Sequence, residues 1–241
     1  MTAPVLSLTD VTFRWQPGLP DVLSVPAFQM QPGERVFLAG PSGSGKSTLL
    51  SLVAGIATPR TGHIQVLGQP LSQMRGSARD RFRADQLGII FQMFNLLPYL
   101  PVLQNVLLPC RFSRARRARA IARDGSVEAQ ARRLLGALGL DADDLLRRPV
   151  TALSVGQQQR VAAARALMGA PALVIADEPT SALDADRRLE FVDLLSSECD
   201  ASGAALLFVS HDQTLASHFP RRLSLLDINQ ADAQSGSEVT P

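Results

Sequence analysis

The stretch "GPSGSGKST", Gly40–Thr48, decides the fold of this 241-residue chain. It fits the pattern G-x-x-x-x-G-K-[ST], with Gly40, Gly45, Lys46 and Ser47 at the fixed positions. The preceding residues, "ERVFLAG", predict a short apolar strand, and the following "STLLSLVAGI" has helical spacing. A strand, a glycine-rich loop and a helix in this order turn backbone N–H groups and the positive end of a helix toward phosphate oxygens. The stretch therefore predicts a nucleoside triphosphate site in an α/β core.

The basic residue of this loop is unusual for the chain. Lys46 is the only lysine, and every other basic residue is an arginine. A compact ammonium suits the β- and γ-phosphates in a way that a planar guanidinium does not, which explains the retained lysine. The hydroxyl of Ser47 is a predicted Mg²⁺ ligand. The rest of the loop is expected to line the nucleotide: Pro41, Ser42, Gly43, Ser44 and Thr48.

Bulk composition argues against several classes of protein. A chain that is 46% hydrophobic and 19% charged suits one globular domain. A net charge of +2 does not by itself indicate a nucleic-acid partner. Cys110 and Cys199 have no metal-site spacing, and we expect two reduced packing residues. We expect no signal peptide, and no apolar run approaches the ~18 residues of a membrane span.

Two adjacent acids end a second apolar run, "ALVIADEPT", Ala172–Thr180. Continuous apolar residues are typical of a parallel strand buried on both faces, and ligands bind at the carboxyl ends of such strands. Successive strand residues point to opposite sides, so the two acids need not share a role. We expect Asp177 to hold Mg²⁺ through water and Glu178 to act as general base on the attacking water.

Two further apolar runs deliver polar side chains to the same predicted edge. "AALLFVS" leads to His211, which is predicted to hydrogen-bond the γ-phosphate and orient the water. "LGII" leads to Phe91 and Gln92, and the neutral Gln92 is predicted to complete the Mg²⁺ and water shell. His63 and His218 have no such placement and are expected to be surface or packing residues.

The octet "LSVGQQQR", Leu153–Arg160, predicts a second anion site. Ser154 is a natural N-cap of a helix that extends to about Met168. A helix start with serine and Gly156 offers free N–H groups, a dipole and a hydroxyl. Because the loop at Gly40–Thr48 already surrounds one triphosphate, the second site is best explained by a nucleotide held by another copy. Two copies arranged head to tail would then enclose two ATP molecules.

Together these motifs resemble an ABC-type ATPase subunit over nearly the whole chain. "GPSGSGKST" resembles the Walker A motif, "FQ" the Q-loop, "LSVGQQQR" the signature motif and "ALVIADE" Walker B. "SALD", ending at Asp184, resembles the D-loop, and His211 the switch histidine. The resemblance adds Gln157 and Asp184 to the nucleotide site and implies that Trp15 stacks on adenine. Val155 departs from the family, whose signature usually has glycine there.

The resemblance also implies the fold and its divisions. We expect a P-loop NTPase core of ABC-ATPase type, an arm of antiparallel strands (about residues 4–30 and 62–70) and an inserted helical subdomain (about 93–160). All three would form a single domain over residues 1–229. The polar residues 230–241 would be a C-terminal tail.

The segment "FQMFNLLPYLPVLQNVLLP" is similar to the bacterial lipoprotein-releasing and macrolide-efflux group. In the family this segment lies near the groove that receives a cytoplasmic helix of the permease. The candidate contacts are Phe94, Leu96, Leu97 and Tyr99, with packing in the subdomain core as the alternative for some of them.

An arginine cluster follows at residues 111–123. A solvated helix face explains it, and attraction to anionic lipid headgroups or an acidic permease loop is the alternative. DNA binding is the weakest hypothesis, because the cluster lacks aromatic interleaving or a recognisable reading helix.

The resemblance implies an ATP- and Mg²⁺-dependent ATPase that dimerises on a separate membrane permease at the cytoplasmic face of a bacterial membrane. Export, including lipoprotein release or efflux, is the expected work. The alternative is an ATPase that passes a mechanical signal through a membrane partner to cell-envelope enzymes without transporting a substrate. A DNA-repair ATPase is a weaker third hypothesis.

Overall fold

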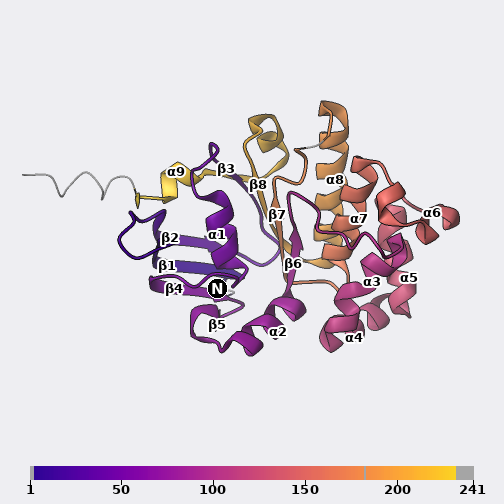
Figure 1. Ribbon diagram of the computed structural model, residues 1–241, viewed down its shortest axis with the longest axis horizontal. Helices are drawn as coiled ribbons and strands as arrows, with labels where there is room; N and C mark the ends of the chain where they lie inside the picture. The colour runs from indigo at the N-terminus through magenta and orange to yellow at the C-terminus, as the bar shows by residue number, and fades with distance from the viewer. Residues whose placement is uncertain (1–2, 182, 232–241) are drawn as a thin grey trace, which may run out of the picture.

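The computed structural model describes residues 3–181 and 183–231 and confirms the α/β fold (Figure 1). The strands are β1 (Leu6–Phe13), β2 (Leu23–Met30), β3 (Arg35–Ala39), β4 (Thr61–Val66), β5 (Gln69–Pro70), β6 (Leu87–Ile90), β7 (Leu173–Asp177), β8 (Ala205–Ser210) and β9 (Arg221–Ser224). The α-helices are α1 (Lys46–Val53), α2 (Gly76–Gln86), α3 (Val102–Phe112), α4 (Arg114–Asp124), α5 (Val127–Ala137), α6 (Asp143–Arg147), α7 (Val155–Leu167), α8 (Ala185–Ser202) and α9 (Leu225–Ile228). Short 3-10 turns lie at Leu71–Gln73, Val150–Ala152 and Gln213–His218.

The strands form two sheets. An antiparallel sheet has the order β2-β1-β4-β5, and its register places Leu6 opposite both Met30 and Val66. This sheet is the arm expected from residues 4–30 and 62–70, which is thereby confirmed. A second sheet, with the order β6-β7-β8-β3-β9, is parallel in every pairing.

The parallel sheet separates two hydrophobic cores. Alternate residues of β7 enter opposite cores, Val174 and Ala176 on one side, Leu173 and Ile175 on the other. One core contains the helices from α3 to α8, and the other contains α1 and the antiparallel sheet (Figure 1). Both faces of the sheet are therefore covered, which explains why its strands are continuous apolar runs.

The arginine cluster is not simply a solvated helix face, because α4 buries some of its arginines and exposes others. Arg116 is only 2% exposed, and its guanidinium donates hydrogen bonds to the carbonyl oxygens of Leu87, Ala166 and Met168. Arg119 and Arg123 also donate to backbone carbonyls, at the ends of α7 and α8. The last carbonyls of a helix lack partners within it, so these arginines supply donors that the fold needs. Half of the cluster is thus structural.

Two remaining features concern the whole chain. Cys110 and Cys199 are free and buried, which confirms them as packing residues. No helix within residues 3–181 and 183–231 is both long and apolar enough to cross a membrane. The expected tail at 230–241 lies largely outside the described residues.

Candidate nucleotide site

The carboxyl edge of the parallel sheet brings four chain segments together. Because β6, β7, β8 and β3 are successive neighbours, the segments that follow them meet at one edge. A cavity of about 430 Å³ lies there. Its lining contains Trp15, Val22, Ser42, Gly43, Gly45, Lys46, Ser47, Thr48, Gln92, Glu178 and His211. All of these except Val22 are residues that the sequence assigned to the nucleotide or its hydrolysis.

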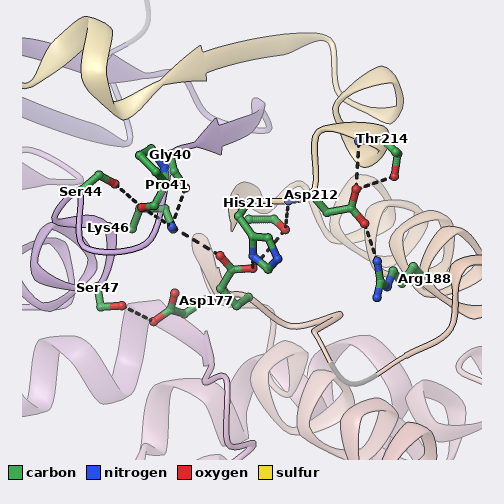
Figure 2. Close-up of polar contacts among 12 residues, drawn as sticks. Gly40, Pro41, Ser44, Lys46, Ser47, Asp177, Arg188, His211, Asp212 and Thr214 are labelled. Atoms are coloured by element: carbon green, nitrogen blue, oxygen red, sulfur yellow. Dashed lines mark hydrogen bonds and ion pairs between the residues drawn. The ribbon is translucent and has the colours of Figure 1, made fainter.

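The phosphate loop has the backbone that its glycines predict. Gly45 precedes α1 with φ +97°, and a Cβ there would lie 3.0 Å from a methyl group of Leu23 and 3.3 Å from the Val22 carbonyl oxygen. The positive φ and these close neighbours, Leu23 of β2 and the preceding Val22, favour glycine here. Lys46 is buried, and its Nζ donates to the carbonyl oxygens of Gly40 (2.6 Å) and Pro41 (3.0 Å). The ammonium group is thus held at the loop itself (Figure 2).

Glu178 is the most constrained acid of the cavity. Its side chain is buried, and its backbone lies in the left-handed region (φ +45°). This conformation costs free energy for a residue other than glycine. Its Oε2 lies 2.9 Å from His211 Nδ1 and accepts a hydrogen bond of 3.2 Å from the Ser210 hydroxyl. Its Oε1 lies 3.6 Å from Lys46 Nζ. These contacts fix the carboxylate between the loop and the histidine, where a general base would stand.

Asp177 and Ser47 face each other (Figure 2), and the Ser47 hydroxyl donates to Asp177 Oδ2 at 3.1 Å. Burial raises the pKa of Asp177, and the hydrogen bond from Ser47 opposes this rise. Asp177 Oδ1 is buried without a hydrogen-bond partner. An unpaired buried carboxylate oxygen beside a hydroxyl suits a hard cation such as Mg²⁺.

Sequence reasoning missed the contacts that hold Ser210 and Asp212, the two neighbours of His211. Ser210 joins the Glu178 carboxylate to the backbone N–H of Asp212. Asp212 in turn accepts hydrogen bonds from Arg188 (2.7 Å) and from the Thr214 hydroxyl (2.6 Å) (Figure 2), and the Thr214 and Arg188 hydrogen bonds lower its pKa. Ser210, His211 and Asp212 are consecutive in the sequence, but Arg188, the partner of Asp212, lies on the distant helix α8.

The predicted second anion site forms a separate pocket of about 270 Å³. Ser154, Gly156 and Gln157 line it together with Gly139, Leu140, Arg160, Leu183 and Arg187. None of these residues lines the first cavity. Asp184 lines neither pocket and is the N-cap of α8, accepting from Arg187 N–H. The phosphate-loop residues and the signature residues of one chain therefore lie in separate pockets.

The start of α7 is as expected. Ser154 is its N-cap, Gln157 completes a capping box, and the helix ends at Leu167. Val155 is the first helical residue, and its side chain is 47% exposed. Its backbone is helical, so the resistance of valine to positive φ has no effect here. Only the bulk of its side chain, next in sequence to the pocket residues Ser154 and Gly156, remains to distinguish it from glycine.

A third cavity, about 440 Å³, lies between α2, β6, α3 and α7. We call it the α2–α3 groove; its lining includes Arg83, Phe91, Asn95, Leu108, Phe112 and Arg165. The four contact residues expected from the sequence do not line it. Phe94 and Leu96 pack in or against the core, the backbone of Leu97 is bound by Asn105, and Tyr99 is 75% exposed outside the groove. From this part of the chain, Phe91, Asn95 and Phe112 line the groove.

Comparison with known proteins agrees with this geometry. Residues 23–181 match the family model described as ABC transporter. An uncharacterized ABC transporter ATP-binding protein of Mycobacterium tuberculosis is 39% identical over 226 residues, which cover 92% of this chain and 87% of that protein. The lipoprotein-releasing system ATP-binding protein LolD 2 of Rhodospirillum rubrum is 38% identical over 229 residues, or 94% and 96% of the two chains.

Two solved structures are similar over 91% of this chain and 93% of theirs. One is the dimeric structure of MJ0796, a bacterial ABC transporter cassette, with a TM-score of 0.78 at 30% identity. The other is a post-hydrolysis state of that cassette bound to ADP and Pi, with a TM-score of 0.76 at 31% identity. The chain therefore belongs to the ABC transporter ATP-binding family, and it is an ATPase.

Proposed function

We propose that this chain is the ATP-hydrolysing subunit of a membrane exporter and works as a head-to-tail homodimer around two ATP molecules. The observation that carries the proposal is the separation of two pockets in one chain. The phosphate loop, Glu178 and His211 line one, and Ser154 and Gly156 line the other. Each pocket is half of a nucleotide site, and a second copy supplies the missing half. The dimeric form of the similar cassette supports this assembly.

In the proposed reaction, water attacks the γ-phosphate of ATP and yields ADP and phosphate. Glu178 takes the proton of the attacking water, and its contacts with His211 and Ser210 hold the carboxylate for that task. Lys46 binds the phosphates, and Trp15, which is exposed at the mouth of the cavity, stacks on adenine. Gln157 and Asp184 of the partner copy complete the site.

Ser47, Asp177 and Gln92 are the residues proposed to hold Mg²⁺. Within residues 3–181 and 183–231 no cluster of three His, Cys, Asp or Glu residues could hold a metal. Mg²⁺ takes few protein ligands and completes its shell with phosphate oxygens and water. When bound, Mg²⁺ neutralises charge that develops on the phosphates.

The proposed partner is a separate permease whose cytoplasmic helix binds in the α2–α3 groove. Phe112 is 79% exposed, although it is apolar, and with Phe91 and Leu108 it gives the groove an apolar lining beside Arg83 and Asp80. The helical part of the chain, about residues 93–160, would move with this partner. The names of the relatives support transport over mechanical signalling, and the name of LolD 2 supports lipoprotein release.

Capture of the partner tests this proposal. The Glu178→Gln chain, purified from native membranes with ATP, is expected to bring a membrane protein with few spans and a large extracytoplasmic domain. Phe112→Asp should reduce recovery of that partner about tenfold or more, because it places a charge in an apolar contact. Leu226→Asp, which changes another exposed apolar residue on α9, outside the groove, is the control. A many-helix permease would contradict the subgroup, and no membrane protein at all would contradict the permease.

We also propose that Arg114 and Arg117, exposed on α4 at the cytoplasmic face of the membrane, add a weak attraction to anionic headgroups. Equal flotation of the chain with phosphatidylglycerol vesicles and with neutral vesicles would contradict this attraction.

Val155→Gly is expected to raise ATP-dependent dimerisation or hydrolysis by roughly 2- to 10-fold, which corresponds to relief of about 0.4–1.4 kcal/mol of crowding. Val155→Ala should have a similar effect, because the backbone is already helical and alanine removes both γ-methyl groups of valine. Dimerisation of the Glu178→Gln forms and hydrolysis by the forms with Glu178 measure the two effects. Unchanged values in both variants would show that valine does not crowd the site.

A further inference from the structure

The segment that follows Gln92 has an unusual backbone. Phe94 and Asn95 are consecutive residues, neither is glycine, and both are left-handed, with φ of +59° and +50°. The turn is closed by hydrogen bonds from Phe94 N–H to the Phe91 carbonyl oxygen (2.9 Å) and from Asn95 N–H to that of Met93 (2.6 Å). Two such residues in succession are strained and persist only where surrounding contacts hold them.

Arg165 supplies those contacts. Its Nη2 donates to the Phe94 carbonyl oxygen at 2.5 Å and its Nη1 to the Asn95 carbonyl oxygen at 2.7 Å. One rigid guanidinium thus donates a hydrogen bond to the carbonyl oxygen of each left-handed residue. Arg165 is half-buried, burial lowers its pKa, and within residues 3–181 and 183–231 no carboxylate pairs with it. Its hydrogen bonds are therefore directed at the turn and at no acidic partner.

Arg165 lies on α7, the helix that begins at the signature residues. From Ser154 to Arg165 is eleven residues, a helical rise of about 16 Å. The guanidinium therefore joins the far end of this helix to a turn two residues after Gln92. The buried ring of Phe94 fixes the same turn in the core.

We propose that Arg165 is a positioning residue for Gln92: by holding the turn Phe94–Asn95 on α7, it makes Gln92 and the signature residues move as one body. This inference rests on the proposed role of Gln92 at the γ-phosphate. Arg165 does not touch the nucleotide cavity, so its loss should misplace Gln92 and leave the phosphate loop intact.

The test compares Arg165→Met with Arg119→Met in the full chain. Arg119 is a matched control, because it too is a half-buried helical arginine that donates to two backbone carbonyls, those of Gly169 and Asp85. We expect Arg165→Met to lower kcat roughly 10- to 100-fold, the effect of a misplaced catalytic group, while KM for ATP changes less than about threefold. Arg119→Met should lower Tm at least as much and keep kcat within about twofold of wild type. Equal kcat values in the two variants would overturn the proposal.

A double-variant cycle with Gln92→Ala assigns the effect to Gln92. If Arg165 acts through Gln92, adding Arg165→Met to Gln92→Ala should slow the enzyme no further, whereas independent losses would multiply and overturn the proposal. Arg165→Lys, which keeps the charge and loses the fork, should recover part of the rate, and it replaces Met in the cycle if Arg165→Met does not fold. Gln92→Ala with a wild-type rate would reject the role of Gln92 itself. A slow Gln92→Ala beside a normal Arg165→Met would reject only the positioning role.

Discussion

Glu178→Gln should abolish steady ATP turnover while ATP still binds. The amide cannot accept the proton of the attacking water, and loss of a general base lowers kcat by about 10²–10⁴-fold. The change is nearly isosteric, and the amide oxygen can still accept the hydrogen bond that Ser210 donates to the carboxylate. Lys46, 2.6 Å from the Gly40 carbonyl oxygen, keeps its place in the loop, so the affinity for ATP should stay within a few-fold. Phosphate release and nucleotide binding measure the two quantities separately.

A matched control for this variant is Glu128→Gln. Glu128 is exposed at the start of α5, where it pairs with Arg132, and has no contact with the cavity. Its turnover should equal that of the wild type. If Glu178→Gln kept turnover within about threefold of wild type, a loss far below that of a general base, another group would have to be the base.

Gly169→Ala should strongly destabilise the fold. Gly169 follows α7 with φ +68°, and an added Cβ would lie 2.4 Å from Arg116 Cβ and 2.7 Å from the Arg116 carbonyl oxygen. Residues of α4 and α5 both bind Gly169, because its N–H donates to Gln130 on α5 and its carbonyl oxygen accepts from Arg119 on α4. The left-handed conformation costs about 1 kcal/mol and the overpacking about 1–3 kcal/mol, so the free energy of unfolding should fall by about 2–4 kcal/mol.

Gly203→Ala separates these two costs. Gly203 ends α8 with nearly the same φ, +70°, but an added Cβ meets nothing within 4 Å. The free energy of unfolding of Gly203→Ala should fall by only about 1 kcal/mol, the cost of the left-handed backbone alone. Thermal unfolding measures both variants, with a Tm shift of roughly 2–4 °C per kcal/mol for a chain of this size. Equal losses in the two variants would show that α4 yields to the new methyl group.

Much of the candidate site could be predicted from local sequence patterns. The loop Gly40–Thr48 was recognisable because its glycines, lysine and hydroxyl must follow one another for backbone N–H groups to surround phosphates. The N-cap Ser154 was recognisable because capping depends on residues three positions apart. The buried parallel strands were recognisable as continuous apolar runs. Each of these inferences depends on neighbours along the chain, so the sequence alone determined the fold class and the family.

The tertiary structure decided the contacts between distant segments. Ser47 meets Asp177 across 130 positions of sequence, and the Arg165 guanidinium reaches carbonyl oxygens 70 positions away. The arginines of α4 are alike in sequence, yet Arg116 is buried and Arg117 is exposed, because the position of α4 beside the end of α7 selects the inward face. Sequence periodicity indicates that a helix has two faces, but which carbonyls need a donor depends on where another helix ends in space.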